Sequence, residues 1–211
     1  MLLTTLIIFD MKNLNRNTVT VENVMTNANK ILNSEVSEIL NLVKLGCDRV
    51  VYLGSSALNG LSKEAALKNL ELTSGKVNST SESVLGFRHG PKSIVNEKTL
   101  VFVFVSNDEY TRKYDIDLLR EIYNDKGNHK VVAITYNKDT EIDKIADKVF
   151  IANSEQHEVI SDAFGALDFV LYAQMFALFY SLELGISPDN PRPDGTVNRV
   201  VKGVTIHQYD K

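Results

Sequence analysis

The sequence predicts an α/β fold of the flavodoxin-like kind, in which a five-stranded parallel sheet carries helices on both faces and forms a three-layer αβα sandwich. Three observations predict it. Short β-branched apolar segments alternate with longer amphipathic ones, which is typical of a parallel sheet with right-handed helical crossovers. The number of apolar segments fits the flavodoxin-like strand order better than a full dinucleotide-binding fold. Apolar residues make up 44% of the 211 residues and charged residues 24%, a composition that excludes a disordered or collagen-like chain.

The chain begins with an apolar run over residues 1–9, MLLTTLIIF. The run is far shorter than the ~20 apolar residues of a membrane span, and it lacks the basic residues and the cleavage site of a secretory signal. It also lacks the polar N-cap of a normal helix start. One interpretation is a terminal helix that is frayed or covered by a partner. The other is the last turns of a helix whose beginning is missing.

The elements of the sandwich are expected in the following order. Residues 19–45 place apolar side chains at near-helical spacing and predict one amphipathic helix. Short apolar segments predict strands at residues 48–54, 77–81, 99–105, 130–135 and 148–152. Helices are predicted between and after them, at residues 57–72, 111–123, 141–147 and 159–184, and the last is apolar enough to be largely buried. The proline-rich segment after residue 186 is expected to lie extended over the surface.

Charge and cysteine content exclude several classes of protein. The chain has 23 basic and 27 acidic residues, a net charge of −4, whereas a nucleic-acid-binding protein is expected to carry a basic excess. Cys47 is the single cysteine, which excludes an internal disulfide, and no Cys/His cluster indicates zinc. We therefore expect a protein of the reducing cytoplasm that needs no metal and binds neither nucleic acid nor membrane.

The turn after the first strand is the first candidate site, because flavodoxin-like sheets bind ligands at the carboxyl ends of their strands. Gly54, Ser55 and Ser56 lead into a helix there, and their small side chains would leave backbone N–H groups open to an anion. The turn lacks the lysine of a P-loop and the middle glycine of a dinucleotide-binding loop, so nucleotide binding is weakly supported. A tight turn with a serine N-cap is the simpler interpretation.

The next helix carries Glu64, Lys68 and Glu71 at i, i+4 and i+7, which places the three side chains on one face. Such a stripe is commonly a solvated ion-pair face. Its position on the helix after the first strand gives a second interpretation, in which a lysine held between two carboxylates supports proton transfer.

The segment SVLGFRHGPK at residues 83–92 places Arg88 and His89 between glycines, directly after a strand. A lone histidine is more often structural than catalytic. The flanking Gly86 and Gly90-Pro91 favour a shaped loop that presents His89, and an imidazole is well suited to acid–base chemistry near neutral pH. We expect the other two internal histidines, His129 and His157, to be surface residues.

Four segments together resemble the sugar isomerase (SIS) domain. They are the strand with its Gly-Ser-Ser turn, EAALKNLELT at residues 64–73, LGFRHGPKS at 85–93 and NRVVKGVTIH at 198–207. Their order and spacing look most like the second SIS domain of AgaS-type proteins, known as tagatose-6-phosphate ketose/aldose isomerases or galactosamine-6-phosphate deaminase/isomerases. The resemblance extends from about residue 48 to residue 207. It implies a hexose or hexosamine phosphate as substrate and no cofactor.

AgaS-type proteins carry two SIS domains in tandem, whereas this chain has one. The resemblance implies that residues 1–18 are the remnant of a preceding SIS domain's last helix and linker, that 19–186 form the SIS domain, and that 187–211 form an extended tail. In the family, the first domain supplies the Ser/Thr-rich loop that grips the substrate phosphate, and this sequence has no such loop. We therefore expect a homo-oligomer or a partner SIS domain.

The resemblance also implies residue roles, through the more distantly related isomerase half of glucosamine-6-phosphate synthase. That enzyme's catalytic lysine and glutamate fall on Lys68 and Glu71, its histidine before Gly-Pro on His89, and its tail lysine on Lys202. Glu71 would move a proton between C1 and C2 of the open-chain sugar, with Lys68 holding it. His89 would open the ring, often from the neighbouring subunit, and Lys202 would approach the carbonyl or form an imine. The expected substrate contacts are Gly54, Ser55, Ser56, Glu64 and Arg88.

These observations predict an isomerase or deaminase/isomerase that converts galactosamine 6-phosphate to tagatose 6-phosphate and ammonia. A carboxylate and an imidazole can serve ring opening and proton transfer without a metal or redox cofactor. The competing hypothesis is a non-catalytic module that binds a sugar phosphate, or an inactive fragment that lacks the first domain.

Overall fold

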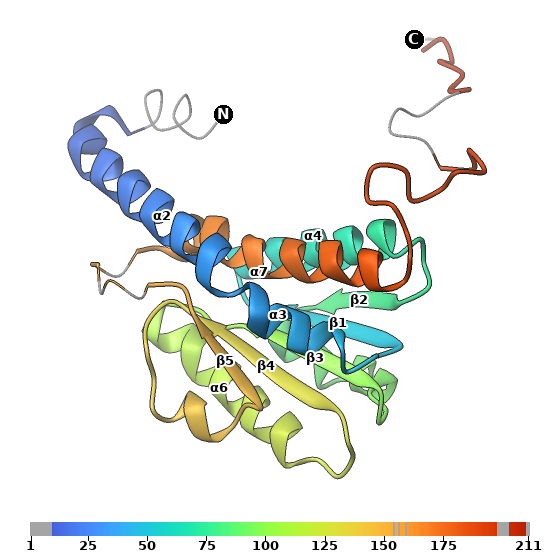
Figure 1. Ribbon diagram of the computed structural model, residues 1–211. Coiled ribbons are helices and arrows are strands. Elements are labelled where there is room, and N and C mark those ends of the chain that lie inside the picture. The colour runs from blue at the N-terminus through green and yellow to red at the C-terminus, as the bar shows by residue number, and fades with distance from the viewer. Residues whose placement is uncertain (1–9, 154, 156, 159, 198–202, 210–211) are drawn as a thin grey trace.

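The computed structural model describes residues 10–153, 155, 157–158, 160–197 and 203–209. At its centre is one parallel sheet of five strands: β1 (Arg49–Gly54), β2 (Asn78–Glu82), β3 (Thr99–Phe104), β4 (Lys130–Thr135) and β5 (Lys148–Ile151). The strand order is β2-β1-β3-β4-β5 (Figure 1). This order confirms the predicted flavodoxin-like sheet and puts its switch point between β1 and β3.

Helices cover both faces of the sheet and make the predicted three layers (Figure 1). One face carries α4 (Ala57–Leu72), α7 (Asp162–Glu183), α2 (Leu14–Ser34), which follows the short η1 (Met11–Asn13), and α3 (Val36–Val43). The other carries α5 (Val84–Phe87), η2 (Pro91–Ile94), α6 (Glu109–Asn124) and η3 (Ile142–Lys144). The reason is strand alternation: Tyr52 and Phe102 belong to the apolar cluster beneath α7, whereas Leu53 and Val103 belong to the cluster beneath α6.

Helix α7 is long and apolar enough to cross a membrane by length and composition alone. In this fold it is the central helix of its layer and packs against α4, α2 and α3. Its Phe176 meets Phe102 edge-on at 5.2 Å between ring centroids, and its Phe169 stacks on Phe104 at 6.3 Å. Each such buried aromatic side chain contributes roughly 1.5–3 kcal/mol of transfer free energy. The core position therefore accounts for the apolar sequence of α7.

The single helix predicted over residues 19–45 is wrong in its bounds and its continuity. The helical segment begins earlier, at Leu14, and is interrupted at Glu35, which leaves the helical conformation at φ −96° and ψ 0°. Just before the break, the side chains of Asn33 and Ser34 donate hydrogen bonds to backbone carbonyls four residues earlier. Such side-chain bonds compete with the helix and favour a bend. The bend lets α3 turn onto α7 while the first half of α2 extends from the body (Figure 1).

Three smaller predictions also need correction. His129 was expected at the surface, yet it is buried, and its Nε2 lies 2.8 Å from the carbonyl oxygen of Ile122 near the end of α6. His157 is half-buried in a loop in which Asn153 bonds its backbone N–H and its carbonyl. The helix expected at residues 141–147 is one short turn, η3. The contacts of both histidines are with residues four and seven positions earlier in the chain.

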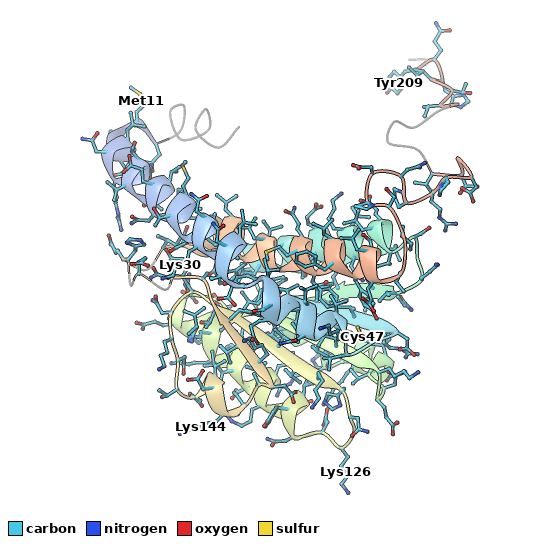
Figure 2. All side chains as sticks on the ribbon, viewed as in Figure 1. Met11, Lys30, Cys47, Lys126, Lys144 and Tyr209 are labelled. Atoms are coloured by element: carbon cyan, nitrogen blue, oxygen red, sulfur yellow. The ribbon has the colours of Figure 1, made fainter. Side chains whose placement is uncertain are left out.

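The described part of the tail, residues 187–197 and 203–209, contains no helix or strand. Two successive turns order its first part, each with Pro-Asp at its centre: the N–H of Asn190 donates to the carbonyl of Ser187, and that of Gly195 to the carbonyl of Arg192. Beyond them Ile206 and Tyr209 are exposed, and Figure 2 shows Tyr209 far from the body of the domain. The tail is thus fixed by local turns near α7 and exposed further on.

Candidate functional site

The turn after β1 is as tight as its small residues suggest. A Cβ on Gly54 would lie 2.4 Å from the carbonyl oxygen of Leu58 at the start of α4, so no side chain fits there. Ser56, the residue before α4, has a positive φ of 50° and makes no side-chain cap. The Ser55 hydroxyl points elsewhere, to a carboxylate 60 residues later in the chain.

That carboxylate, Asp115 on α6, is fully buried at the carboxyl edge of the sheet. Its Oδ1 accepts a hydrogen bond from the Ser55 hydroxyl at 2.5 Å, and its Oδ2 accepts one from the Ser106 N–H at 2.9 Å. Burial raises its pKa to about 6 against these hydrogen bonds. A second carboxylate, Asp162, accepts from the Ser106 hydroxyl at 2.5 Å and the Asn107 N–H at 2.7 Å. The Ser55 and Ser106 hydroxyls and the N–H groups of Ser106 and Asn107 at this edge therefore already bind the protein's own carboxylates.

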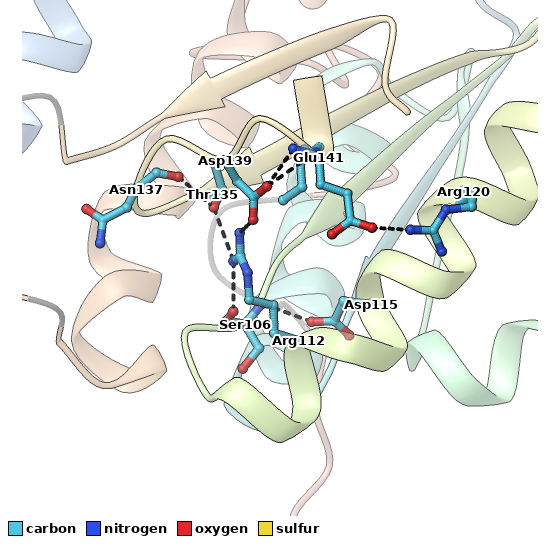
Figure 3. Close-up of polar contacts among 9 residues, drawn as sticks. Ser106, Arg112, Asp115, Arg120, Thr135, Asn137, Asp139 and Glu141 are labelled. Atoms are coloured by element: carbon cyan, nitrogen blue, oxygen red, sulfur yellow. Dashed lines mark hydrogen bonds and ion pairs between the residues drawn. The ribbon is translucent and has the colours of Figure 1, made fainter. Parts of the chain in front are cut away.

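Figure 3 shows the rest of this polar edge. The Arg112 guanidinium binds the Asp139 carboxylate at 2.6 Å and donates to the carbonyl of Ser106 at 3.2 Å. Asp139 also accepts from the N–H groups of Glu141 and Ile142, and Arg120 pairs with the Glu141 carboxylate. These contacts fasten the loops after β3 and β4 to α6. Many side chains at the edge where such sheets commonly bind ligands are thus paired with one another, and among them the Ser55 hydroxyl is held by Asp115. The expected substrate contacts of Gly54, Ser55 and Ser56 stay a prediction.

The Glu64–Lys68–Glu71 stripe lies on α4 as its spacing predicts. The Lys68 ammonium is 2.7 Å from the Glu71 carboxylate and 3.8 Å from that of Glu64. The hydrogen bond that Lys68 donates to the Glu71 carboxylate is the main reason that the pKa of Lys68 is raised. Glu71 is fifteen residues after Ser56 along a helical path, so the two residues are about 22 Å apart along the axis. The structure therefore brings Lys68 and Glu71 together and separates them from the Gly54–Ser56 turn.

Lys68 and Glu71 line an open hollow of about 950 Å³. One wall is the end of α4 with the turn at Ser74 and Gly75, and the other is the tail over residues 188–197. The tail contributes Arg192, which the sequence analysis did not single out. Arg192 stands between Pro191 and Pro193 in the sequence, and proline on both sides restricts the backbone. This pattern could have indicated that the arginine is held in a defined position.

Arg88 and His89 lie on the opposite face of the sheet, next to α6. The Arg88 guanidinium pairs with Glu121 at 2.6 Å, and Lys92 pairs with the same carboxylate at 2.6 Å. The hydrogen bond from Lys92 is the main reason that the pKa of Glu121 is lowered. His89 is exposed, and within one chain the sheet separates it from Glu71. Arg88 is therefore held in an ion-pair cluster, and His89 faces outward.

Two further expectations concern the tail and metals. Lys202 lies outside the described residues, so its place relative to the hollow stays a prediction. Within the described ranges, no three His, Cys, Asp or Glu side chains gather in an arrangement that would hold a metal ion.

The sequence model of the SIS domain matches residues 45–181 of this chain. The chain belongs to the SIS domain family. The D-galactosamine-6-phosphate deaminase AgaS of Escherichia coli O157:H7 is 47% identical to it over 161 residues, which are 76% of this chain and 41% of the relative. The AgaS deaminase of Shewanella sp. strain ANA-3 is 40% identical over 184 residues, 87% of this chain and 44% of the relative. The chain thus spans less than half the length of these curated relatives.

Two solved structures extend this comparison. A Clostridium novyi NT protein assigned as a tagatose-6-phosphate ketose/aldose isomerase is similar with a TM-score of 0.95 and 47% identity, over 99% of this chain and 53% of that one. The tagatose-6-phosphate ketose/aldose isomerase of Escherichia coli is similar with a TM-score of 0.80 and 35% identity, over 99% of this chain and 52% of that one. This SIS domain corresponds to about half of each solved chain.

Proposed function

We propose that this SIS domain supplies the proton-transfer side of a sugar-phosphate isomerase or deaminase/isomerase acting on galactosamine 6-phosphate or tagatose 6-phosphate. The observation that carries the proposal is the Lys68–Glu71 pair, 2.7 Å apart, at the wall of an open hollow. The substrate class comes from the similarity to AgaS deaminases and tagatose-6-phosphate isomerases. The cytoplasm, where such sugar phosphates occur, remains the predicted location.

The chemistry follows from the position of the carboxylate. Ring opening exposes a carbonyl at C1 and makes the proton on C2 acidic. Glu71 takes that proton and returns it to C1, and the Lys68 ammonium, which donates a hydrogen bond to Glu71 at 2.7 Å, orients the carboxylate. With an amino group at C2, one proton of that group passes to O1 as C1 is protonated, which gives a ketimine, and water hydrolyses the ketimine to the ketose phosphate and ammonia.

The site needs a second domain or subunit. Within the described residues, His89 lies across the sheet from Glu71, so its role in ring opening requires a site formed with a neighbouring subunit. Leucines on the outer sides of α4 and α7 are exposed by 36–54%: Leu67, Leu70, Leu178 and Leu182. Apolar side chains gathered on two adjacent helices are typical of a covered surface. The relatives, with more than twice the matched length, provide enough chain for a second SIS domain.

Binding of the substrate phosphate is the second reason to expect a partner domain or subunit. Because the carboxyl edge of this sheet already binds Asp115 and Asp162, a partner must contribute most phosphate contacts. Losing two or three charge-assisted hydrogen bonds, at ~1.5–3 kcal/mol each, weakens binding by roughly 10²–10⁶. We expect the 211-residue chain alone to show no measurable turnover and at best millimolar affinity for hexosamine phosphates. Turnover by the chain alone would show that the phosphate contacts are wrongly assigned to a partner.

The test of the proposed function is Glu71→Gln in the chain co-expressed with the half of the Clostridium novyi protein that it does not span. Glutamine keeps the shape of the side chain and removes the base, so kcat should fall by ~10²–10⁴ with little change in KM. Glu38→Gln is the matched control, because Glu38 pairs with Lys148 at 2.6 Å and its side chain is 43% exposed, against 2.7 Å and 44% for Glu71. Equal kcat values for both variants would mean that Glu71 only forms a surface ion pair with Lys68. That result would favour a non-catalytic binding module.

A further inference from the structure

We infer that Arg192 is a catalytic residue of the hollow that holds Lys68 and Glu71, where its guanidinium binds the substrate oxygen that becomes negative when Glu71 removes the C2 proton. The inference rests on the proposed function and names a group which that proposal leaves open. A cation at this oxygen stabilises its developing charge, and among the described residues the lining of the hollow offers two, Lys68 and Arg192.

Lys68 is already committed to carboxylates. Its ammonium lies 2.7 Å from Glu71 and 3.8 Å from Glu64, so two negative charges offset its one positive charge. Arg192 is different: among the described residues no carboxylate oxygen lies within 4.0 Å of its guanidinium. Its charge contributes to lowering the pKa of Asp194, but that carboxylate is held chiefly by the N–H and hydroxyl of Thr196. Of the two cations in the described lining of the hollow, Arg192 is thus the one available to a ligand.

The backbone holds Arg192 in place. It is the first residue of the turn that Pro193, Asp194 and Gly195 complete, with the Gly195 N–H donating to the Arg192 carbonyl at 3.1 Å. Prolines on both sides restrict the backbone at and next to Arg192, which reduces the entropy lost when the residue engages a ligand. Preorganised donors are those that stabilise a developing charge most strongly.

The movement of electrons during the proton transfer defines the role of Arg192. When the C2–H bond breaks, its proton goes to the Glu71 carboxylate and its electron pair forms the C1=C2 double bond. The π pair of the C1 carbonyl moves onto O1, which becomes the enediolate oxygen, or the enaminolate oxygen of an amino sugar. The Arg192 guanidinium pairs with O1 at this stage. In the reverse direction the O1 electron pair re-forms the C1 carbonyl as C2 is reprotonated. In the forward direction the hydroxyl or amino group on C2 gives a proton to O1, its electron pair forms the C2=O or C2=N bond, and Glu71 protonates C1. In both directions the charge leaves O1, so the guanidinium binds the intermediate more tightly than substrate or product.

Arg192→Ala in the assembled enzyme is the test, with Arg16→Ala as the control, since Arg16 lies on α2 with its side chain 72% exposed. Removing one donor to a developing oxyanion lowers kcat by ~10²–10³. We expect that loss for Arg192→Ala with KM unchanged within about threefold, a smaller loss for Arg192→Lys, and partial rescue by added guanidinium ion. A role as a phosphate contact would instead raise KM at unchanged kcat. That result, or wild-type kinetics, would overturn the inference.

A binding experiment gives a readout that needs no turnover. A sugar-phosphate hydroxamate mimics the planar enediolate, and titration calorimetry should show its affinity falling ~10²-fold in Arg192→Ala while that for the ketose phosphate is kept. Equal hydroxamate affinity in wild type and variant would overturn the inference. If Glu71→Gln is inactive and Arg192→Ala is normal, only this inference fails; if Glu71→Gln is fully active, the proposed function fails as well.

Discussion

Replacing Asp168 by Asn should remove a pH dependence of stability that the interior of this domain creates. Asp168 lies on α7 and is fully buried. The Asn27 amide of α2 donates to its Oδ2 at 3.2 Å, and the hydroxyl of Tyr136 lies 3.4 Å from the same amide nitrogen. Among the described residues the other carboxyl oxygen of Asp168 and the amide oxygen of Asn27 have no partner. A proton on Asp168 would add a donor to a carboxyl group that otherwise only accepts.

The magnitude follows from burial, which raises the pKa of Asp168 to about 7 from an ordinary value of 3.8. Between these two values the folded chain holds the proton and the unfolded chain has lost it. The free energy of unfolding contributed by this group is therefore largest below pH 3.8, falls as the pH rises, and becomes constant above about pH 7. At 1.36 kcal/mol for each pH unit the whole decrease is roughly 4 kcal/mol, of which about 3 kcal/mol falls between pH 5 and pH 8.

Urea denaturation of wild type and Asp168→Asn at pH 5, 6, 7 and 8 measures this directly. The amide keeps the size of the side chain and cannot ionise, so wild type should lose about 3 kcal/mol relative to the variant between pH 5 and pH 8. Asp143→Asn removes an exposed carboxylate and should run parallel to wild type. Parallel curves for wild type and Asp168→Asn would refute the reasoning, because they would mean that Asp168 titrates alike in the folded and unfolded chain.

Two further predictions concern packing and assembly. Gly54→Ala should lower the free energy of unfolding in urea by about 1–3 kcal/mol, since its Cβ would lie 2.4 Å from a backbone oxygen. Gly60→Ala, whose Cβ would have nothing within 4 Å, should raise it by about 0.5–1 kcal/mol. Equal changes in the two variants would disprove the steric account. Wild type should self-associate in light scattering at tens of micromolar, and the double variant Leu178→Lys/Leu182→Lys should not, because it places charges on exposed apolar positions of α7. A monodisperse wild-type monomer would contradict the covered-surface argument.

Local patterns were enough to predict most of the fold. The segment KVVAIT at β4 and the bounds of α4 at residues 57–72 were predicted without error, because hydrophobic periodicity and turn residues act within a few positions of the chain. The helix break at Glu35 and the burial of His129 were missed. Each depends on what the segment packs against, such as α7 for α3 and the end of α6 for His129.

The same division holds for the site. The sequence alone determined that Lys68 and Glu71 share a helix face, since their spacing matches the helical repeat, and that the chain forms a parallel α/β sheet. Only the tertiary structure decided that Ser55 is engaged by Asp115, that His89 lies across the sheet from Glu71, and that Arg192 lines the Glu71 hollow. The physical reason is range: helical and strand spacing bring together residues a few positions apart, whereas crossovers and packing bring together residues separated by 60 or more positions.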